Sequence, residues 1–333
     1  FLNRQEKVIF ENEFIDVNVL RQASQNRENI FVPTLPVIEK LQDKLSQKHL
    51  LQSLQIPTSR FKKIHSIQNI LSELQEFQKA CVLKWSRQGY DGKGVLILDA
   101  IDSRTENQIL SFCEEGVQRG AEIYAEEKID FVQELAIIAV RSVTGDFIHY
   151  PLVLSEQKNG ICEIVKGPAT RLGTPSILEQ QAAEYAKCLA QSLHLVGAFA
   201  LELFQEGSGA LLVNEIAPRV HNSGHYTQDV GNASQFENHW RGVLGLPLIE
   251  PQIKTFFAMY NLLGPASHDQ VVSKAALPPV DASLYLHWYD KSRLKPLRKM
   301  GHLNGVVNQS AELDLLLNQM KRWESEWFQN IRK

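Results

Sequence analysis

Two short apolar segments joined by a glycine turn place two glutamates opposite each other in this sequence. Residues 196–204 carry Glu202, residues 210–213 run directly into Glu215, and the turn at 207–209 has glycine at both ends. This pattern predicts an antiparallel hairpin with both carboxylates on paired strands. Neighbouring carboxylates repel each other unless a cation lies between them, and Mg²⁺ binds through one or two carboxylates plus substrate phosphates. The hairpin therefore predicts a metal site; two hydrated acids are the alternative, although the apolar neighbours would make an unpaired carboxylate costly.

The residues after the second strand gather polar side chains into a loop. Asn214 and Glu215 start on opposite faces of the strand, and a turn of the backbone at its end would bring both to one cleft. Pro218 and Gly224 predict irregular backbone beyond that point. The polar side chains of this loop are those of Arg219, His221, Asn222, Ser223 and His225.

These residue types suit an oxyanion-rich substrate and a metal ion better than a hydrophobic ligand. An arginine can hold a carboxylate or phosphate through two hydrogen bonds and can stabilise charge that develops in a transition state. The two histidines are candidates for acid–base groups or hydrogen-bond donors, with ordinary surface positions as the alternative. Zinc binding is disfavoured, because the spacing of His221 and His225 falls on a broken loop and not on a helix.

A glycine-rich stretch, GYDGKG at residues 89–94, lies between two apolar segments that read as strands. Glycines allow the backbone to approach a polyanion closely, and its N–H groups can surround a phosphate. The stretch is not a Walker A loop, because a strand follows it and not a helix. A plain hairpin turn is the alternative. The lysine at the end of the preceding strand, Lys84, favours a lid over a nucleotide.

A basic stretch from Lys291 to His302 is the last candidate site, and it contains Lys291 and Arg298. A hydrated charged face is the ordinary interpretation of such a run, and a small phosphate-binding patch is the functional one.

The composition excludes several classes of function. With 35 basic and 38 acidic residues among 333, the net charge of −3 offers no basic field for nucleic acid. No apolar run approaches the roughly 18 residues that span a bilayer, and the N-terminus is polar within three residues. Four cysteines are far apart and form no CxxC pair. We therefore expect a protein of the reducing cytoplasm without a membrane segment or signal peptide.

Hydropathy periodicity predicts alternating strands and helices along the chain. We expect strands at residues 7–10, 30–32, 80–84, 95–98, 122–126, 131–143, 147–154, 256–262 and 282–288, besides the hairpin. We expect helices at residues 16–25, 37–54, 67–78, 105–116, 175–193, 234–244 and 311–328, and a basic loop at residues 289–302.

Five motifs follow one another in the order found in the 5-(carboxyamino)imidazole ribonucleotide synthase family of ATP-grasp ligases, which this chain resembles. They are GYDGKG at 89–94, NEIAPRVHNSGHYTQ at 214–228, SQF at 234–236, LGLPL at 244–248 and HWYDK…RKMGHLN at 287–304. The resemblance implies an α+β ATP-grasp fold in three parts. These are a partial N-terminal α/β domain (1–40), an ATP-grasp domain (41–248, with a lid at about 60–125) and a small β-rich C-terminal domain with a terminal helix (249–333).

The resemblance also implies an activity. Members of the family carboxylate 5-aminoimidazole ribonucleotide with bicarbonate in purine biosynthesis, hydrolyse ATP to ADP and phosphate with Mg²⁺, and pass through carboxyphosphate. The product is N5-carboxyaminoimidazole ribonucleotide, and the family implies a homodimer. Such chemistry depends on positioning and charge neutralisation, and a lid must exclude water from the labile intermediate.

Roles for individual residues follow only from this resemblance. Lys84 matches the lid lysine, Glu126 to Ile129 the hinge beside adenine, and Glu134 the ribose-binding acid. The full set of nucleotide-binding matches is Lys44, Lys84, Gly89, Tyr90, Asp91, Gly92, Lys93, Gly94, Val95, Glu126, Glu127, Lys128, Ile129, Glu134, Gln157, Asn214 and Glu215.

The remaining matches concern the metal and the other substrates. Glu202 and Glu215 match the magnesium ligands, and Arg219 matches the arginine of the carboxyphosphate step. The loop around bicarbonate and the imidazole is matched by His221, Asn222, Ser223 and His225. Lys291 and Arg298 resemble the contacts to the 5′-phosphate of the ribonucleotide.

The sequence departs from the family at several positions. Lys44 replaces the usual arginine and loses its planar fork. Gln157 replaces a common histidine, Leu154-Ser155 replaces Glu-Asn, and the segment between Lys291 and Arg298 is one residue longer, with Leu297 in place of a usual glycine.

The family's opening GGGQLG-type turn is absent from the sequence. We expect the sequence to be a fragment; a divergent member with a damaged substrate site is the alternative. Two alternatives to the family's activity remain: an ATP-grasp ligase for another carboxylate and amine, and a nucleotide-binding relic without turnover. The first alternative would tolerate loss of Lys291 and Arg298.

Overall fold

The computed structural model describes residues 2–77, 80–89, 93–102, 104–158, 160–265, 270–271 and 277–331. Tyr90, Asp91 and Gly92 of the predicted phosphate loop lie outside the described residues.

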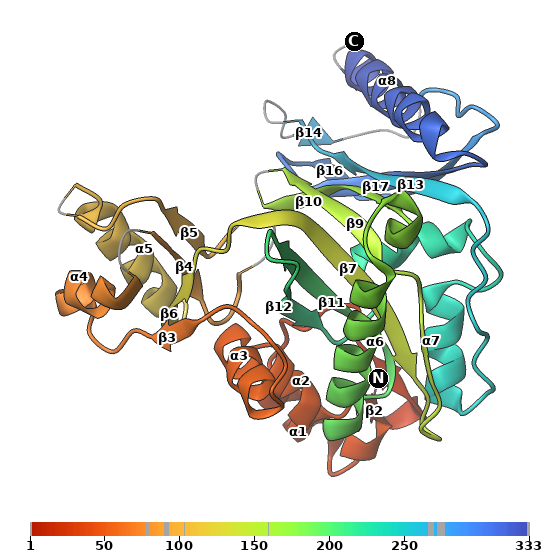
Figure 1. The fold of residues 1–333 in the computed structure, drawn as a ribbon. Helices are drawn as coiled ribbons and strands as arrows, with labels where there is room; N and C mark the ends of the chain where they lie inside the picture. Colours follow the sequence, from red (N-terminus) through yellow and green to blue (C-terminus); the bar gives the residue numbers. More distant parts are fainter. Residues whose placement is uncertain are drawn as a thin grey trace.

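A large antiparallel sheet forms the body of the molecule (Figure 1). Within the described residues its strand order is β12-β11-β7-β9-β10-β13-β17-β15, and β8 pairs with β7. The strands are β7 (Phe131–Arg141), β8 (Phe147–His149), β9 (Val153–Lys158), β10 (Ile161–Gly167), β11 (Gly197–Glu206), β12 (Leu211–Ala217), β13 (Phe256–Leu263), β15 (Leu284–Trp288) and β17 (Lys299–Val307). The sheet is continuous from β10 to β13, so the C-terminal strands extend the same layer.

Helices cover both faces of this sheet. On one face, α6 (Ser176–Ser192) packs in a cluster that includes Ile137 and Ala139 of β7. On the other face lies α7 (Gln235–Leu244), whose Gly242 approaches the side chain of Val140. Because successive residues of a strand face opposite ways, β7 contributes to two cores and reads as a continuous apolar run. The terminal helix α8 (Leu313–Ile331) packs on β13 and β17 at the far end (Figure 1).

The lid is a smaller four-stranded sheet that projects from the body, at the left of Figure 1. Its order is β3-β6-β4-β5, with β3 (Phe61–Lys63), β4 (Cys81–Trp85), β5 (Val95–Leu98) and β6 (Ile123–Glu127). Two helices, α4 (Ile70–Glu73) and α5 (Glu106–Gln118), pack against it around a separate apolar cluster. The antiparallel pairing of β4 with β5 confirms the hairpin predicted around the glycine-rich stretch.

The N-terminal segment completes the body below the large sheet. Its strands β1 (Val8–Ile9) and β2 (Phe31–Val32) pair in parallel through α1 (Val17–Ser24), as expected for the end of an α/β unit. Two helices follow, α2 (Leu35–Leu41) and α3 (Lys44–Ser53). A short pair of strands, β14 (Gln270–Val271) and β16 (Arg293–Leu294), lies apart from the main sheet.

The single helix predicted over residues 37–54 is wrong, because the chain breaks at Asp43. The backbone of Asp43 is extended (φ −107°, ψ 111°), and its carboxylate accepts a hydrogen bond from the Ser46 N–H at 2.8 Å, which caps α3. The N–H of Lys44 donates to the Ser86 carbonyl of the lid at 2.7 Å. Helical spacing of the leucines continues across this break, so periodicity alone did not reveal it.

Four other predicted elements differ from the structure. The helix expected at 67–78 is α4 flanked by 3₁₀ turns at Ile67–Asn69 and Gln75–Phe77. The strand expected at 147–154 is two strands, β8 and β9, and β10 was not predicted. The basic loop expected at 289–302 contains β16 and the first residues of β17. The second hairpin strand, β12, continues past Val213 to Ala217, which changes how Glu215 reaches the site.

Candidate active site

Glu202 and Glu215 are direct partners in the register of β11 and β12, as the hairpin predicted. The next pair along the two strands joins Leu203 to Val213, so Asn214 is an extra residue that has no partner on β11. This β-bulge interrupts the alternation of faces, and Asn214 and Glu215 are both partly exposed on the same run. The prediction that the backbone turns at the strand's end is therefore wrong: a bulge inside the strand brings both side chains to the cleft.

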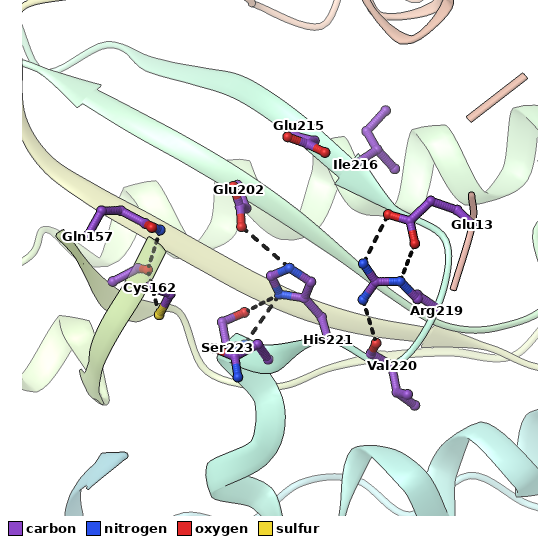
Figure 2. Close-up of polar contacts among 12 residues, drawn as sticks. Glu13, Gln157, Cys162, Glu202, Glu215, Ile216, Arg219, Val220, His221 and Ser223 are labelled. Atoms are coloured by element: carbon purple, nitrogen blue, oxygen red, sulfur yellow. Dashed lines mark hydrogen bonds and ion pairs between the residues drawn. The ribbon is translucent and has the colours of Figure 1, made fainter. Parts of the chain in front are cut away.

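The two carboxylates have partners of different charge. The Lys44 ammonium lies 2.6 Å from Glu215 Oε2. Glu202 faces the neutral ring of His221, whose Nε2 lies 3.4 Å from Glu202 Oε1 (Figure 2). Loss of hydration and the nearby Glu215 carboxylate raise the pKa of Glu202 to about 7. A carboxylate with this environment favours either a proton or a cation beside it.

The lid lysine also reaches this cluster. Lys84 Nζ lies 3.2 Å from Asn214 Oδ1 and 3.2 Å from Glu126 Oε1, so it bridges the bulge to the end of β6. Burial by itself would raise the pKa of Glu126, but the Lys84 and Lys48 ammonium groups outweigh it and lower that pKa to about 2. The lid and the body are thus joined at the candidate site by buried charges.

At the described ends of the glycine-rich stretch, Gly94 packs closely against Trp85. The Trp85 N–H donates to the Gly94 carbonyl at 2.9 Å, and Gly94 has a φ of +69°. A Cβ at Gly94 would lie 2.8 Å from the Trp85 ring. Gly89, Lys93, Gly94 and Val95 therefore lie where β4 turns into β5, beside the strand that carries Lys84.

The hinge segment, Glu126 to Ile129, connects the lid strand β6 to the body strand β7, which carries Glu134. Glu126 and Glu127 end β6, and Lys128 and Ile129 precede β7. A small pocket in the body is lined by Glu134, Gln157, Glu202 and Asn214, among others. Burial and the Glu202 carboxylate raise the pKa of Glu134 to about 7, against the hydrogen bond from Gln157.

Arg219 has a carboxylate partner that the sequence did not reveal. Glu13, from the segment between β1 and α1, accepts hydrogen bonds from Arg219 Nε and, at 3.0 Å, from Arg219 Nη2 (Figure 2). Glu13 is 5% exposed, and the Arg219 Nη1 group donates to the Val220 carbonyl at 3.1 Å. This two-point contact fixes the plane of the guanidinium. Glu13 lies within the ENEF stretch at 11–14, but nothing in the local pattern indicates a partner 206 residues away.

The histidines of the loop are largely buried and neutral, so the alternative of surface positions is wrong. Ser223 N–H donates to His221 Nδ1 at 3.3 Å, which leaves the ring proton on Nε2, facing Glu202. Burial, with Arg219 and Lys299 nearby, holds the pKa of His221 well below its usual value. Burial and Lys299 lower the pKa of His225 to about 3.

His225 belongs to a stack that the sequence did not predict. Its ring lies 5.1 Å from that of His302, which lies 4.6 Å from that of His287. Tyr289 hydrogen-bonds His302 Nδ1 at 2.7 Å. Asn222 is held separately by Asn261 of β13, through hydrogen bonds of 2.7 and 2.9 Å. The C-terminal strands therefore supply one wall of the predicted bicarbonate and imidazole loop.

Lys291 and Arg298 lie between β15 and β17, close in the chain to this histidine stack. Lys291 Nζ donates to the Lys299 carbonyl at 2.7 Å and lies 5.3 Å from the centre of the Tyr289 ring. Arg298 Nη1 donates to the Arg293 carbonyl at 2.8 Å. Both cations are partly exposed and are anchored on the loop itself.

The two candidate carboxylate ligands suit magnesium, which takes few ligands from the protein, better than a metal whose ligands all come from the protein. In the described part of the chain, no group of three or more histidine, cysteine, aspartate or glutamate residues is placed to hold a metal ion. Mg²⁺ commonly takes only one or two carboxylates and completes its shell with phosphates and water. The opposed pair Glu202 and Glu215 provides that number of ligands.

A separate lid sheet, a glycine hairpin, a lid lysine and two opposed carboxylates are the features of the ATP-grasp class of nucleotide-dependent ligases. The family model for the ATP-grasp domain matches residues 49–236, and the model for the phosphoribosylaminoimidazole carboxylase C-terminal domain matches residues 258–314. The N5-carboxyaminoimidazole ribonucleotide synthase of Synechococcus elongatus is 37% identical over 302 residues, which are 89% of this chain and 72% of that protein. The chain belongs to the N5-carboxyaminoimidazole ribonucleotide synthase family. The predicted family and the α+β ATP-grasp fold are thereby confirmed.

Solved structures give the same result. The Thermus thermophilus N5-carboxyaminoimidazole ribonucleotide synthetase has a TM-score of 0.81 and 32% identity, covering 97% of this chain and 83% of its own. The Aspergillus clavatus synthase, solved with ADP and 5-aminoimidazole ribonucleotide, has a TM-score of 0.79 and 25% identity, covering 94% and 80%. Among the residues described, no helix is both long and apolar enough to cross a membrane.

Proposed function

We propose that this protein carboxylates 5-aminoimidazole ribonucleotide with bicarbonate, at the expense of ATP, and forms N5-carboxyaminoimidazole ribonucleotide, ADP and phosphate. The names of its relatives support the reaction, and the ADP and ribonucleotide bound by the Aspergillus clavatus synthase support the substrates. The observation that carries the proposal is the opposition of Glu202 and Glu215 across β11 and β12, directly below the lid lysine.

Nucleotide binding is assigned to the cleft between the lid and the body. Lys84 and the backbone of Gly89–Val95 are expected to hold the phosphates, as a lysine and a glycine turn suit a polyanion. The segment Glu126–Ile129 is expected to meet the adenine, and Glu134 with Gln157 the ribose. Lys44, paired with Glu215 here, keeps that carboxylate neutralised and in place beside Asn214.

Glu202 and Glu215 would hold Mg²⁺, which neutralises phosphate charge as bicarbonate attacks. The raised pKa of Glu202 and the two-carboxylate ligand set are the features that fit the ion.

The other residues of the loop are assigned to holding the substrates in position. Arg219, fixed by Glu13, presents a cation where negative charge develops on the carboxyphosphate. The neutral His221 can donate from Nε2, and Ser223 holds its ring. Asn222 and His225 border the space for bicarbonate and the imidazole, while Lys291 and Arg298 are assigned to the 5′-phosphate. We further expect a cytoplasmic homodimer, which light scattering of the purified protein would test.

The decisive experiment measures whether ATP hydrolysis is coupled to carboxylation of the ribonucleotide. Full-length protein with ATP, Mg²⁺ and bicarbonate should release ADP rapidly only when the ribonucleotide is added, with one labelled bicarbonate incorporated per ADP. ADP release that does not depend on the ribonucleotide would refute the substrate. A variant lacking both Lys291 and Arg298 (Lys291→Ala with Arg298→Ala) should lose this dependence, and unchanged kinetics in it would point to another amine substrate.

A further inference from the structure

A third lysine, Lys48 on α3, lies buried at the hinge of the lid. Its side chain is 2% exposed. Its ammonium nitrogen lies 2.8 Å from Thr58 Oγ1, 2.9 Å from Ser59 Oγ and 3.3 Å from Glu126 Oε2. The ammonium group thus donates two hydrogen bonds, to Thr58 and Ser59, and forms an ion pair with Glu126.

These contacts span both connections between the body and the lid. Thr58 and Ser59 belong to the segment that enters the lid before β3, and Glu126 lies at the end of β6, where the chain leaves it. The two connections also touch each other, because the Glu127 N–H donates to the Arg60 carbonyl at 2.8 Å. Thr58 in turn donates to the Val213 carbonyl at 2.7 Å, next to the bulge. Lys48 therefore lies where the hinge meets the metal-site strand.

Glu126 has two lysines, and it holds them differently. Oε2 accepts a hydrogen bond from Ser59 at 2.8 Å and faces Lys48. Oε1 lies 3.2 Å from Lys84. Lys48 is in addition linked to the carboxylate through the Ser59 hydroxyl, which accepts a hydrogen bond from Lys48 and donates one to Oε2. Burial lowers the pKa of Lys48 to about 8, against the attraction of Glu126, so the ammonium form persists at neutral pH.

We propose that Lys48 is the permanent counter-ion of Glu126 and thereby a positioning residue that frees Lys84 to move onto the phosphates of the nucleotide. Removing one partner of a buried ion pair is costly when the other charge is left alone. With Lys48 in place, Lys84 leaves a carboxylate that is still neutralised, so nucleotide binding carries no such penalty. The inference rests on the proposed function in one respect, namely that Lys84 binds the nucleotide.

The test compares Lys48→Met with the double variant Lys48→Met, Glu126→Gln. In Lys48→Met, Lys84 is the only cation left on Glu126, so the affinity for Mg·ADP should fall about 100-fold. The KM for ATP should rise with kcat within a few-fold, since the loss is of binding and not of chemistry. The thermal midpoint without nucleotide should change little, because Lys84 still neutralises Glu126.

Removing the negative charge as well should restore binding. The double variant should regain about 10-fold or more of the affinity that Lys48→Met loses, because no unpaired carboxylate is left, and Lys48→Arg should retain most of the affinity. Lys62→Met is the matched control, because Lys62 also pairs with two carboxylates in the lid, Glu73 and Glu76, but its side chain is 35% exposed. The affinity of this variant for Mg·ADP should be unchanged. If Lys48→Met does not fold, Lys48→Gln takes its place with the same rescue.

Equal weakening of the single and double variants would assign Lys48 a purely structural role and overturn the proposal, as would a Lys48→Met protein with wild-type affinity. Failure of the proposed function has a different signature. Wild-type protein that binds Mg·ADP without ribonucleotide-dependent turnover would refute that function and leave the Lys48 comparison decisive. Wild-type protein that binds no nucleotide would overturn both.

Discussion

Glu202 and Glu215 face each other in register across a hairpin, yet each carboxylate has its partner in a different part of the chain, and only the partner of Glu215 is a cation. Lys44 from the start of α3 lies against Glu215, and His221 from the following loop lies against Glu202. Glu215 therefore has a counter-charge without a metal, whereas Glu202 has only a neutral histidine beside it. The Lys44 ammonium limits the repulsion between the two adjacent carboxylates, while burial and the remaining repulsion raise the pKa of Glu202.

The first prediction concerns these carboxylates. Glu202→Gln should lower ATP-dependent turnover about 100-fold or more, because an amide is a poorer magnesium ligand than a carboxylate. The same change should leave the free energy of unfolding unchanged or increased without magnesium, since it removes one of two neighbouring negative charges. Steady-state kinetics at several magnesium concentrations and denaturant unfolding measure the two effects. Glu206→Gln, at the end of the same strand, is the control and should leave both unaffected.

The second prediction concerns the pair of Glu13 and Arg219. Glu13→Gln should lower kcat about 10- to 100-fold with little change in the KM for ATP, because the guanidinium loses its two-point anchor and its orientation. In a double-mutant cycle with Arg219→Met, the two losses should be strongly non-additive. Glu11→Gln, exposed and two residues away, is the matched control. Additive losses would show that the two residues act separately.

The third prediction separates backbone strain from crowding in the lid. Gly94→Ala and Gly209→Ala both place a side chain at positive φ, +69° and +89°, which costs roughly 1 kcal/mol or more. Only Gly94→Ala also meets a neighbour, because its Cβ would lie 2.8 Å from the Trp85 ring. We therefore expect Gly94→Ala alone to raise the KM for ATP, by displacing the phosphate loop. A similar KM in both variants would contradict this.

The fourth prediction concerns acid stability. His239 is 2% exposed, its Nδ1 accepts the Ala198 N–H at 2.8 Å, and burial lowers its pKa to about 4. The unfolded chain takes up this proton near pH 6.5, so it binds more protons than the folded chain between pH 6.5 and 4. The free energy of unfolding should therefore fall as the pH is lowered through this range, by up to about 3 kcal/mol from this residue. Denaturant unfolding at several pH values should show a shallower slope for His239→Gln, and an unchanged slope would contradict the assignment.

The local sequence pattern was sufficient to predict the parts of the site that are formed by residues close together in the sequence. The hairpin of Glu202 and Glu215, and the glycine turn beside Lys84, follow from apolar segments broken by glycine, since strand pairing across a short turn is a local matter. The same reasoning missed the bulge at Asn214, because one extra residue in a strand leaves no mark on the hydropathy pattern.

Contacts between distant segments were decided by the tertiary structure alone. Glu13 meets Arg219 across 206 positions, and Lys44 meets Glu215 across 171, because the first helices pack under the strands that follow the lid. At the break between α2 and α3, the Asp43 carboxylate caps α3 locally, and the lid adds the Ser86 carbonyl that accepts the Lys44 N–H. The sequence by itself determined which strands and turns could form and which carboxylates they carry. Only the folded chain decided which side chain lies beside each of them, because a long side chain finds its partner through the packing of elements and not through its neighbours in sequence.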